Sequence, residues 1–533
     1  MPAIGFGHGP GLHDLVDGRL MRAIHRLFAA TAVLGALMLN AQGQGPPRRV
    51  SPPPADMPTD ASREAPKDGG RETSRLPPDQ TSHHTLELPG RTLAFAATAG
   101  AIRLSNDEAV PRADVAFVAY QLEGADKRSR PVAFIFNGGP GMASGWLQAG
   151  CIGPWRISIG GAAGVPSASP EPMPNADTWL DFTDLVFIDP PGTGYSEILG
   201  KGDDARRRLW SVDGDIDAMA EVIRRWLDRN GRTVSPKFLV GESYGGFRAP
   251  RLARALQSNF GVGISGMVLL SPLLDVHAES GYNDPLSWVS GLPTEVAAAR
   301  ALKGKVTRAD MADVEQYAAT DYLIDMMRGI RDTAAVSRMS DRIAALTGID
   351  RAVVARYSGR LDGDVFLHEL ERGQGRVNSV YDTTVSSTDP FPRRPLSEYP
   401  DPVLEALKAP VTSAMMAIYS EQLNWRPDGV YRLENDEAFK EWNWGRGMGR
   451  PESLSYLQSA LALDPRMHVL IAHGLFDLRT PYFGTVRMLN QLPDAASAER
   501  VKLVVYPGGH MFYSEDASRS AFRDAASGLF SLQ

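Results

Sequence analysis

The chain has 533 residues, of which 43% are hydrophobic and 22% are charged, and its formal net charge at pH 7 is −7. This composition is typical of a globular protein with an ordinary hydrophobic core, and the length allows one large domain with an insertion or two domains. The chain carries no basic stripe, which argues against nucleic acid as a partner. Cys151 is the single cysteine, so an intramolecular disulfide and a metal site built from several cysteines are excluded. We expect no metal and no cofactor.

The first 83 residues differ in composition from the rest. A basic stretch at residues 21–26 precedes an apolar run at 27–39 and small residues near 43, which is the three-part pattern of a secretory signal. We interpret residues 1–43 as a signal peptide whose true start is Met21, and residues 44–83 as a disordered, Pro-rich linker. A buried or anchoring helix is the alternative. The apolar run is too short for a stable membrane span, so we expect an exported protein, either periplasmic or secreted.

Short stretches of alternating polarity follow and predict antiparallel strands at residues 85–88, 93–96 and 113–120. Continuous apolar runs then predict strands buried on both faces, as in a parallel sheet, at residues 131–136, 185–188, 238–240, 267–270, 469–472 and 501–506. Helical patterns lie between these runs. One of them places Ile216, Met219 and Ile223 on one face, and Asp213 is a plausible N-cap for that helix.

The strand pattern stops between about residues 280 and 444, where helical segments such as 309–331 and 333–347 replace it. We interpret residues 291–440 as a helical cap inserted between two parts of a sheet domain, 84–290 and 441–533. The predicted fold class is therefore α/β: a mixed, mostly parallel sheet with helices on both faces and an inserted helical cap.

Residues 240–246 read Val-Gly-Glu-Ser-Tyr-Gly-Gly and directly follow an apolar run. A G-x-S-x-G motif between a strand and a helix is the pattern of a nucleophile elbow, in which the serine lies at the tip of a sharp turn. Gly241 and Gly245 would flank the serine because side chains there would collide with the neighbouring strand and helix. Ser243 is therefore the candidate nucleophile.

A serine nucleophile needs a base, and the base needs an orienting carboxylate. Ligands of open α/β sheets bind beyond the carboxyl ends of the strands, where His510 follows the last apolar run and Asp477 follows the one before it. The order Ser…Asp…His suits this type of site. A surface-loop histidine and a turn-capping aspartate are the alternative interpretations. His473 is a rival base, but it shares a loop with Asp477 and we expect it to pack structurally.

Acyl chemistry also needs donors for the developing oxyanion. The backbone N–H of Tyr244, directly after the nucleophile, would supply one of them. The Gly138–Gly139 pair follows an early strand and would supply the other, because glycine lets the backbone approach the reacting carbonyl closely.

Taken together, several segments resemble the serine carboxypeptidase family of the α/β-hydrolases, from about residue 85 to the C-terminus. These segments are Asn137-Gly-Gly-Pro-Gly141, Asp189-Pro-Pro-Gly-Thr-Gly-Tyr-Ser196, Gly241-Glu-Ser-Tyr-Gly-Gly246, Asp477 and Gly509-His-Met511. The resemblance implies an α/β-hydrolase fold and the removal of single residues from the free C-termini of peptides through an acyl-enzyme.

The resemblance also assigns roles to residues. It implies a catalytic triad of Ser243, Asp477 and His510, an oxyanion hole at Gly139 and Tyr244, and binding of the substrate's terminal carboxylate by Asn137 and Glu242 beside Gly138. Two carboxylates repel each other, so Glu242 would have to be protonated to donate a hydrogen bond, and activity would be favoured at acidic pH.

The chain departs from the family at Met142-Ala143-Ser144, where Cys-Ser-Ser is usual, and at Gly246, which extends the elbow as Gly-Gly where Ala-Gly is usual. These differences imply a divergent, bacterial-type branch. An esterase or acyltransferase with the same triad, and a non-catalytic binding protein on a hydrolase scaffold, are the alternative functions. We expect Trp146, Trp442 and Trp444 to be core residues, and the sequence carries no signal for an oligomeric state.

Overall fold

The computed structural model describes residues 76–532, except for 107, 160–170, 201–202, 277–283, 394–398, 446–450 and 494–498. The predicted signal peptide and most of the predicted linker lie outside the described residues, which all belong to one compact unit, Glu72–Gln533. The first strand begins at Gln80, so the last residues of the predicted linker are part of the sheet. Their polar side chains belong to an edge strand that faces solvent on one side, which is why their composition resembled that of a linker.

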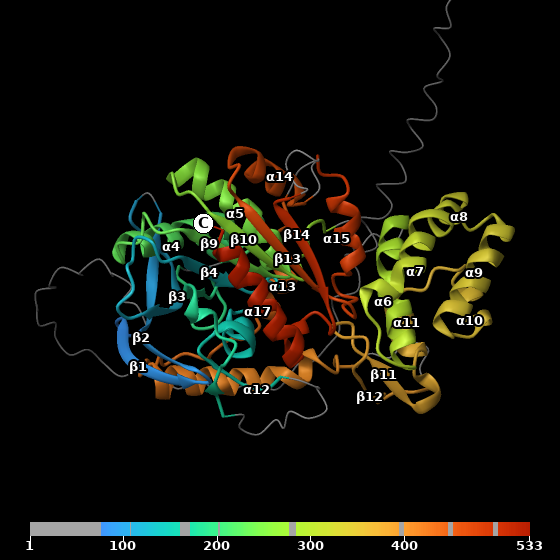
Figure 1. Cartoon of the computed structure of the whole chain (residues 1–533), viewed down its shortest axis with the longest axis horizontal. Helices are drawn as coiled ribbons and strands as arrows, with labels where there is room; N and C mark the ends of the chain where they lie inside the picture. Colours follow the sequence, from blue (N-terminus) through green and yellow to red (C-terminus); the bar gives the residue numbers. More distant parts are fainter. Residues whose placement is uncertain are drawn as a thin grey trace, which may run out of the picture. The chain divides into compact units, whose positions relative to one another are not determined.

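Within the described ranges, ten strands form one sheet in the order β1-β2-β3-β7-β4-β9-β10-β13-β14, with β8 pairing to β3. The strands are β1 Gln80–Leu88, β2 Arg91–Ser105, β3 Pro111–Leu122, β4 Val132–Phe136, β7 Asp184–Ile188, β8 Glu197–Ile198, β9 Lys237–Glu242, β10 Gly266–Leu270, β13 His468–Gly474 and β14 Val501–Tyr506. The first three are antiparallel, and those from β7 to β14 pair in parallel. The predicted mixed, mostly parallel sheet is therefore confirmed (Figure 1).

Helices cover both faces of the sheet, because successive strand residues point to opposite sides. In β9, Phe238 and Val240 join the core on one face and Leu239 joins the core on the other. The face of Leu239 is covered by α4 Val212–Arg229, α5 Tyr244–Phe260 and α14 Leu454–Leu463. The opposite face is covered by α12 Leu404–Ala417, α17 Asp516–Phe530 and the π-helical turn η1 Gln148–Ile152.

The remaining elements of the sheet domain are short or lie at its margin. They are α2 Gly145–Leu147, β5 Trp155–Arg156, β6 Met173–Pro174, α3 Asp203–Leu209, α13 Asp436–Glu441 and α15 Tyr482–Leu489. Across the described ranges, none of the helices combines the length and the apolar composition that a membrane crossing requires.

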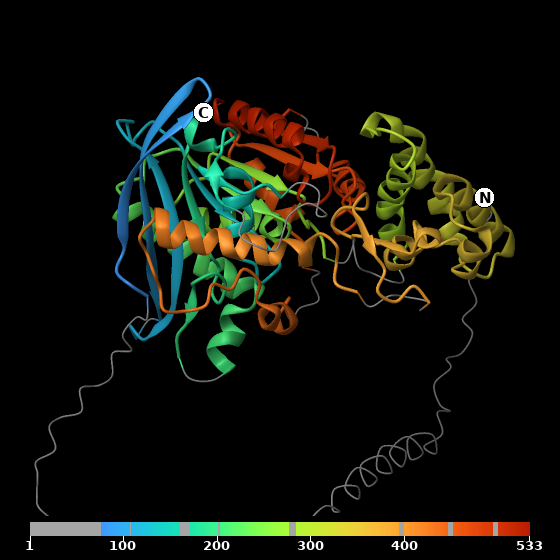
Figure 2. The same ribbon diagram turned by 90° about the horizontal axis from the view of Figure 1, so that it is seen from below.

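The segment predicted as a cap lies in two places. Its first part forms a helical cluster with its own core, made of α6 Pro285–Ala301, α7 Ala312–Tyr317, α8 Leu323–Arg328, α9 Thr333–Thr347, α10 Arg351–Arg356 and α11 Gly363–Glu369. A hairpin of β11 Arg376–Asn378 and β12 Ser386–Thr388 follows. Its later part, including α12, packs into the core of the sheet domain, and Figures 1 and 2 both show α12 (orange) beside β1 and β2.

The helix predicted to begin at Asp213 has a different N-cap. The Ser211 hydroxyl accepts a hydrogen bond from Gly214 N at 3.1 Å, and α4 begins at Val212. The prediction for Asp213 is therefore wrong: this residue lies in the first turn, where an acidic side chain is also favourable.

A buried group of charges holds the amino end of β7. The Asp184 carboxylate accepts from Arg130 Nε at 2.7 Å and from Leu122 N at 3.0 Å, and it forms a second ion pair with Arg232. The Arg232 side chain is fully buried, and its other end donates to the Arg130 carbonyl oxygen at 2.8 Å. The group therefore joins β3, β7 and the turn that precedes β9.

We expect Asp184→Asn to destabilise the protein by about 3–5 kcal/mol, because it leaves a buried guanidinium without its counter-charge. Asp203→Asn is the matched control. Asp203 pairs with Arg207 at 3.8 Å on the surface, and loss of such a pair changes stability by less than about 1 kcal/mol. Thermal and denaturant unfolding followed by circular dichroism measure both. Equal unfolding midpoints for the two variants would contradict a structural role of this ion-pair group.

Candidate active site

The predicted site residues lie at the carboxyl ends of four parallel strands. Asn137 to Gly139 follow β4, Ser243 follows β9, Asp477 follows β13 and His510 follows β14. Asn137, Ser243 and His510 line one cavity together with Gly138, Gly139 and Glu242. Asn137 and His510 are more than 350 residues apart in the sequence. They lie close together because the carboxyl ends of parallel strands meet at one edge of the sheet, which is where ligands bind.

Ser243 occupies the sharp turn between β9 and α5. Its φ of 60° and ψ of −121° are unusual for a residue with a side chain, and such backbone strain is typical of a nucleophile elbow. A Cβ on Gly241 would lie 2.2 Å from the carbonyl oxygen of Gly245. The turn therefore needs glycine at Gly241, as the sequence predicted.

His510 is held from one side by Asp477. The Nδ1 of His510 is 2.8 Å from Asp477 Oδ2, and both side chains are buried. Asp477 is fixed in turn by Thr480, whose hydroxyl donates to Oδ2 at 2.7 Å and whose N–H donates to Oδ1 at 3.0 Å. Because Nδ1 carries this contact, Nε2 is the nitrogen available for Ser243. No hydrogen bond between Ser243 and His510 is present in the described part of the chain, although both line the cavity.

The two histidines near the site differ in environment. Burial lowers the pKa of His510, but attraction by Asp477, the hydrogen bond to it and the Glu242 charge outweigh that effect, so the pKa is raised overall. His473 is fully buried with Nε2 2.9 Å from the Thr485 hydroxyl, and burial lowers its pKa to about 4. His473 is therefore a neutral packing residue, in agreement with the structural role expected for it.

The candidate oxyanion donors lie close together. A Cβ on Gly138 would be only 2.4 Å from Tyr244 N, so glycine lets the β4 loop approach the elbow. Tyr244 is the first residue of α5, and the N–H groups of a first helical turn have no intrahelical acceptor. Across the described residues, Gly139 N also has no hydrogen-bond acceptor. Both N–H groups are therefore free to bind an oxyanion.

Asn137 and Glu242 form a buried pair in the same cavity. Asn137 Nδ2 donates to Glu242 Oε2 at 2.5 Å, and Asn137 Oδ1 accepts from Leu147 N at 3.1 Å, which fixes the amide orientation. Glu242 also accepts from the Tyr513 hydroxyl, which is 3.2 Å from Oε1 and 3.1 Å from Oε2. Burial raises the pKa of Glu242 to about 7, against the opposing effects of His510, Tyr513 and Asn137.

A fully buried ion pair supports both segments that carry the candidate oxyanion donors. Arg248 on α5 contacts Asp215 on α4 through Nε at 2.7 Å and Nη2 at 3.1 Å, and its Nη1 donates to the Asn137 carbonyl oxygen at 2.7 Å. The guanidinium also lies 5.1 Å from the ring centre of Tyr244, whose hydroxyl is 3.3 Å from Asp215. One cation thus contacts the residue before Gly138 and the residue after Ser243.

The loop after β7 braces the β4 loop from its other side. The Asp189 carboxylate accepts from Ser144 N at 2.8 Å and from the Ser144 hydroxyl at 2.7 Å. Ser196 closes the same loop by donating to the Asp189 carbonyl oxygen at 2.6 Å and accepting from Ala116 N at 2.8 Å. The Asp189–Ser196 motif is therefore structural support and does not contribute to the cavity wall.

The profile of the serine carboxypeptidase family matches residues 112–506, which is most of the chain. The chain belongs to the serine carboxypeptidase family. The matched region contains all the predicted site residues except His510, which lies four residues beyond its end.

Individual members of this serine carboxypeptidase family are distant relatives. Serine carboxypeptidase-like 42 of Arabidopsis thaliana is 28% identical over 219 residues, covering 39% of this chain and 42% of the plant protein. The pheromone-processing carboxypeptidase KEX1 of Coprinopsis cinerea is 30% identical over 167 residues, covering 29% of this chain and 24% of the fungal protein. The chain thus matches less than half the length of these relatives. The crystal structure of the prohormone-processing carboxypeptidase Kex1ΔP of Saccharomyces cerevisiae aligns over 86% of this chain and 92% of its own, with a TM-score of 0.49 and 14% identity.

The structure explains why Gly-Gly follows Tyr244 in this serine carboxypeptidase family member. A Cβ on Gly245 would lie 2.8 Å from the Phe136 carbonyl oxygen, and one on Gly246 would lie 2.4 Å from Pro272 Cβ. The end of β4 and the loop after β10 therefore leave no room for alanine at Gly245 and Gly246. Met142, which stands where the family usually has cysteine, lines the cavity.

Several cavity residues were missed by the sequence reasoning. They are Tyr381, Leu404, Phe439, Arg479 and Met511. The Tyr381 carbonyl oxygen accepts from His510 N at 2.5 Å, and its ring lies 5.4 Å from the His510 ring. Arg479 and Met511 were detectable because they neighbour Asp477 and His510, whereas Tyr381 lies in the insertion, where no local pattern indicates its contact.

The three tryptophans considered above lie in two settings. Trp146 is 2% exposed and lines the cavity, so it is both core and cleft wall. Trp442 and Trp444 are half-buried and pack against the Tyr244 ring at 5.3 and 5.6 Å, behind the elbow. These two pack at the margin of a small apolar cluster, so the expectation of a core position holds for Trp146 and only in part for Trp442 and Trp444.

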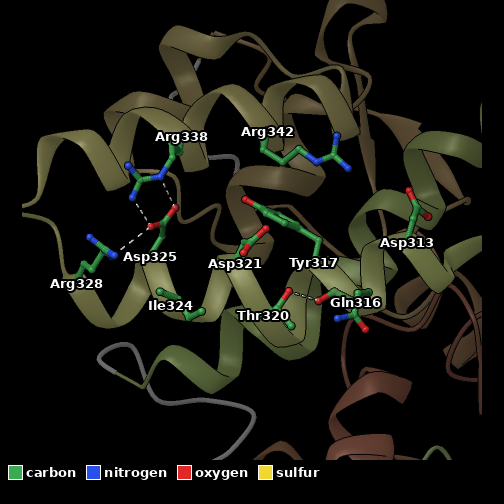
Figure 3. A pocket seen from close by; sticks show the side chains of 10 residues that line it. All are labelled: Asp313, Gln316, Tyr317, Thr320, Asp321, Ile324, Asp325, Arg328, Arg338 and Arg342. Atoms are coloured by element: carbon green, nitrogen blue, oxygen red, sulfur yellow. Dashed lines mark hydrogen bonds and ion pairs between the residues drawn. The ribbon is translucent and has the colours of Figure 1, made fainter.

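A second hollow lies in the cap between α7, α8 and α9 (Figure 3). Its charged side chains largely neutralise each other. Asp325 pairs with Arg338 at 2.5 Å and with Arg328 at 3.7 Å, as the dashed lines show. Most of the lining side chains are exposed, so we interpret this hollow as a solvated surface of the cap. Within the described residues, no group of three or more His, Cys, Asp or Glu side chains is placed to hold a metal ion.

We expect a fluorophosphonate probe to label Ser243, and His510→Ala to slow labelling by about 10³-fold or more, because a serine hydroxyl without its base is a weak nucleophile. His473→Gln is the control that separates the two histidines, and it should label within a few-fold of the parent. Labelling is measured by mass spectrometry of the modified peptide, with Ser243→Ala as the blank. Slow labelling in His473→Gln and normal labelling in His510→Ala would reverse the assignment of the base.

Proposed function

We propose that this protein is a serine carboxypeptidase that removes single residues from peptides with a free C-terminal carboxylate. The observation that carries the proposal is the buried Asn137–Glu242 pair in the cavity that Ser243 and His510 also line. An esterase needs a nucleophile, a base and an oxyanion hole, but it has no need of a buried amide and a buried acid aimed at a leaving group. Membership of the serine carboxypeptidase family supports the same activity.

In the proposed mechanism, Ser243 Oγ attacks the carbonyl carbon of the last peptide bond while His510 Nε2 accepts its proton. Asp477 holds the imidazole by Nδ1 and stabilises the imidazolium that forms. The N–H groups of Gly139 and Tyr244 stabilise the oxyanion, a contribution of roughly 3–4 kcal/mol for each donor. His510 then gives its proton to the leaving amine, and water hydrolyses the acyl-enzyme by the same steps.

The terminal carboxylate of the substrate would bind to Asn137 Nδ2 and to the protonated Glu242 carboxyl. A neutral Glu242 can donate a hydrogen bond, whereas an ionised one repels the substrate. The Glu242 charge is also one of the causes that raise the pKa of His510. Protonation of Glu242 therefore helps His510 to stay in the neutral form that a base requires, and both residues can be in their working states at mildly acidic pH.

We also propose that the protein is exported, to the periplasm or outside the cell. The support is the basic, apolar and small-residue pattern at residues 21–43. The peptide substrate is the partner that the proposed activity implies.

The test is a comparison of an N-blocked dipeptide with its C-terminal amide and its methyl ester. We expect kcat/KM for the free acid to exceed that for the amide by about 10- to 100-fold, because only the free acid engages Asn137 and Glu242 through charge-assisted hydrogen bonds. Ser243→Ala supplies the background rate. Equal cleavage of acid and amide, with faster turnover of the ester, would favour an esterase or acyltransferase. Absence of both turnover and probe labelling would favour a binding protein.

We expect Glu242→Gln to retain more of its peptidase activity at neutral and alkaline pH than the parent does. Glu242 has a pKa raised to about 7, so the parent loses the donor form as pH rises through that value, whereas the glutamine amide donates at every pH. The measurement is kcat/KM for the free-acid dipeptide across pH 4–9. The ester, which has no terminal carboxylate, is the control substrate. Superimposable pH profiles of the two proteins would remove Glu242 from carboxylate binding.

A further inference from the structure

Tyr513 contacts Glu242, the acid of the Asn137–Glu242 pair. It lies in the short 3₁₀ turn η8 Phe512–Ser514, three residues after His510, and it is fully buried. Its hydroxyl is within hydrogen-bond distance of both Glu242 oxygens, at 3.2 and 3.1 Å. Glu242 therefore has two side-chain partners, Asn137 on the side of the β4 loop and Tyr513 on the side of the His510 loop.

These two partners differ in what they can offer a carboxyl group. Asn137 turns its Oδ1 toward Leu147 N and presents Nδ2 to Glu242, and an amide nitrogen can only donate. A tyrosine hydroxyl can donate to an ionised carboxylate. It can also accept from a protonated carboxyl in the free protein, and it can donate to the carbonyl oxygen of that carboxyl when the carboxyl proton is given to a substrate. Of the two, Tyr513 is the partner that stays satisfied when Glu242 gains or loses its proton.

The position of Tyr513 is well supported. Arg519 Nη1 donates to the Tyr513 carbonyl oxygen at 3.2 Å, and Arg519 Nε contacts Asp177 at 2.9 Å. A Cβ on Gly150 would lie 3.4 Å from the Tyr513 ring, so the helical turn η1 packs closely against one ring edge. The hydroxyl is thereby directed at Glu242 by contacts on several elements.

We propose that Tyr513 is a positioning residue for substrate recognition, whose hydroxyl holds the Glu242 carboxyl against Asn137 and stays hydrogen-bonded to it in both protonation states. This inference rests on the proposed role of Glu242 in binding the terminal carboxylate of a peptide. By donating to the ionised form, Tyr513 also lowers the upper pH limit of that binding.

The other titratable groups around Glu242 come from three elements. His510 and Asp477 face it from the loops after β14 and β13, and Cys151 lies near it in η1. Burial raises the pKa values of Cys151 and Tyr513 well above their ordinary ranges. Both groups therefore keep their protons throughout the working pH range, and the proton that Tyr513 can donate to Glu242 is always present.

The sign of the expected effect follows from the strengths of the two hydrogen bonds. A hydrogen bond to an ionised carboxylate is stronger than one to a neutral carboxyl. Tyr513 therefore favours ionised Glu242, and its removal raises the pKa of that residue. Glu242 then stays protonated to higher pH, and binding of a substrate carboxylate persists further into the alkaline range.

We expect Tyr513→Phe to move the alkaline limb of the kcat/KM profile for a free-acid dipeptide upward by about one pH unit. The Glu242→Gln protein has no such limb, so adding Tyr513→Phe to it should produce no further shift. Tyr322→Phe is the matched control: it removes another buried hydroxyl, bonded to the Gly359 carbonyl oxygen in the cap, and should leave the limb in place. Tyr513→Met serves as a second variant if the phenylalanine protein folds poorly.

A direct titration separates this proposal from the proposed function. The C=O band of protonated Glu242 can be followed by infrared difference spectroscopy and identified by its loss in Glu242→Gln. Its midpoint should shift upward by about one pH unit in Tyr513→Phe, whether or not peptides are hydrolysed. An unchanged midpoint would overturn the role of Tyr513 while leaving carboxypeptidase activity intact. A shifted midpoint in a protein that does not distinguish free acid from amide would instead overturn the proposed function.

Discussion

The ion pair of Arg248 and Asp215 is the constraint on which the rest of the site depends. Both side chains are removed from water, so the guanidinium has to find all its partners inside the protein. It finds them in Asp215, in the Asn137 carbonyl oxygen and in the faces of aromatic rings. These partners belong to β4, α4 and α5, and a buried charge tolerates little displacement of any of them. The two segments that would supply oxyanion donors are thus fixed relative to each other before a substrate arrives, which is the preorganisation that this chemistry requires.

Burial also affects the two acids beside His510, and it affects them differently. Asp477 and Glu242 are both buried acids near His510, but their environments differ. Asp477 accepts hydrogen bonds from two backbone N–H groups, from the Thr480 hydroxyl and from His510, which hold its carboxyl group in place beside the imidazole. Glu242 has only the Asn137 amide and the Tyr513 hydroxyl, so burial dominates and its pKa rises to about 7. The same cavity edge therefore holds one carboxylate suited to orient an imidazole and one carboxyl suited to donate to a substrate.

Local sequence patterns predicted most of the strands and helices. The predictions that differ from the structure do so for physical reasons. Continuous apolar runs mark strands such as β4 and β9 because a parallel sheet buries both faces, and each predicted strand is present. The N-cap was misjudged because Ser211 and Asp213 are both good caps in isolation, and Asp213 suits the first turn equally well. The start of β1 was missed because an edge strand can be polar. The region that contains α12 was grouped with the cap, although its apolar face packs on the main sheet.

Local sequence patterns are sufficient to predict the groups whose role depends on short-range geometry. The strand–Ser243–helix turn and its glycines can be predicted because they follow from a few adjacent residues. The order of Ser243, Asp477 and His510 can be predicted because an apolar run precedes each of them. The contacts between side chains that are hundreds of residues apart become known from the three-dimensional structure alone. Local periodicity does not predict the contacts of Tyr513 with Glu242, of Arg248 with Asn137 and of Tyr381 with His510. They arise from the packing of separate elements at one sheet edge, and burial there alters the hydrogen bonding and pKa of groups that the sequence can only name.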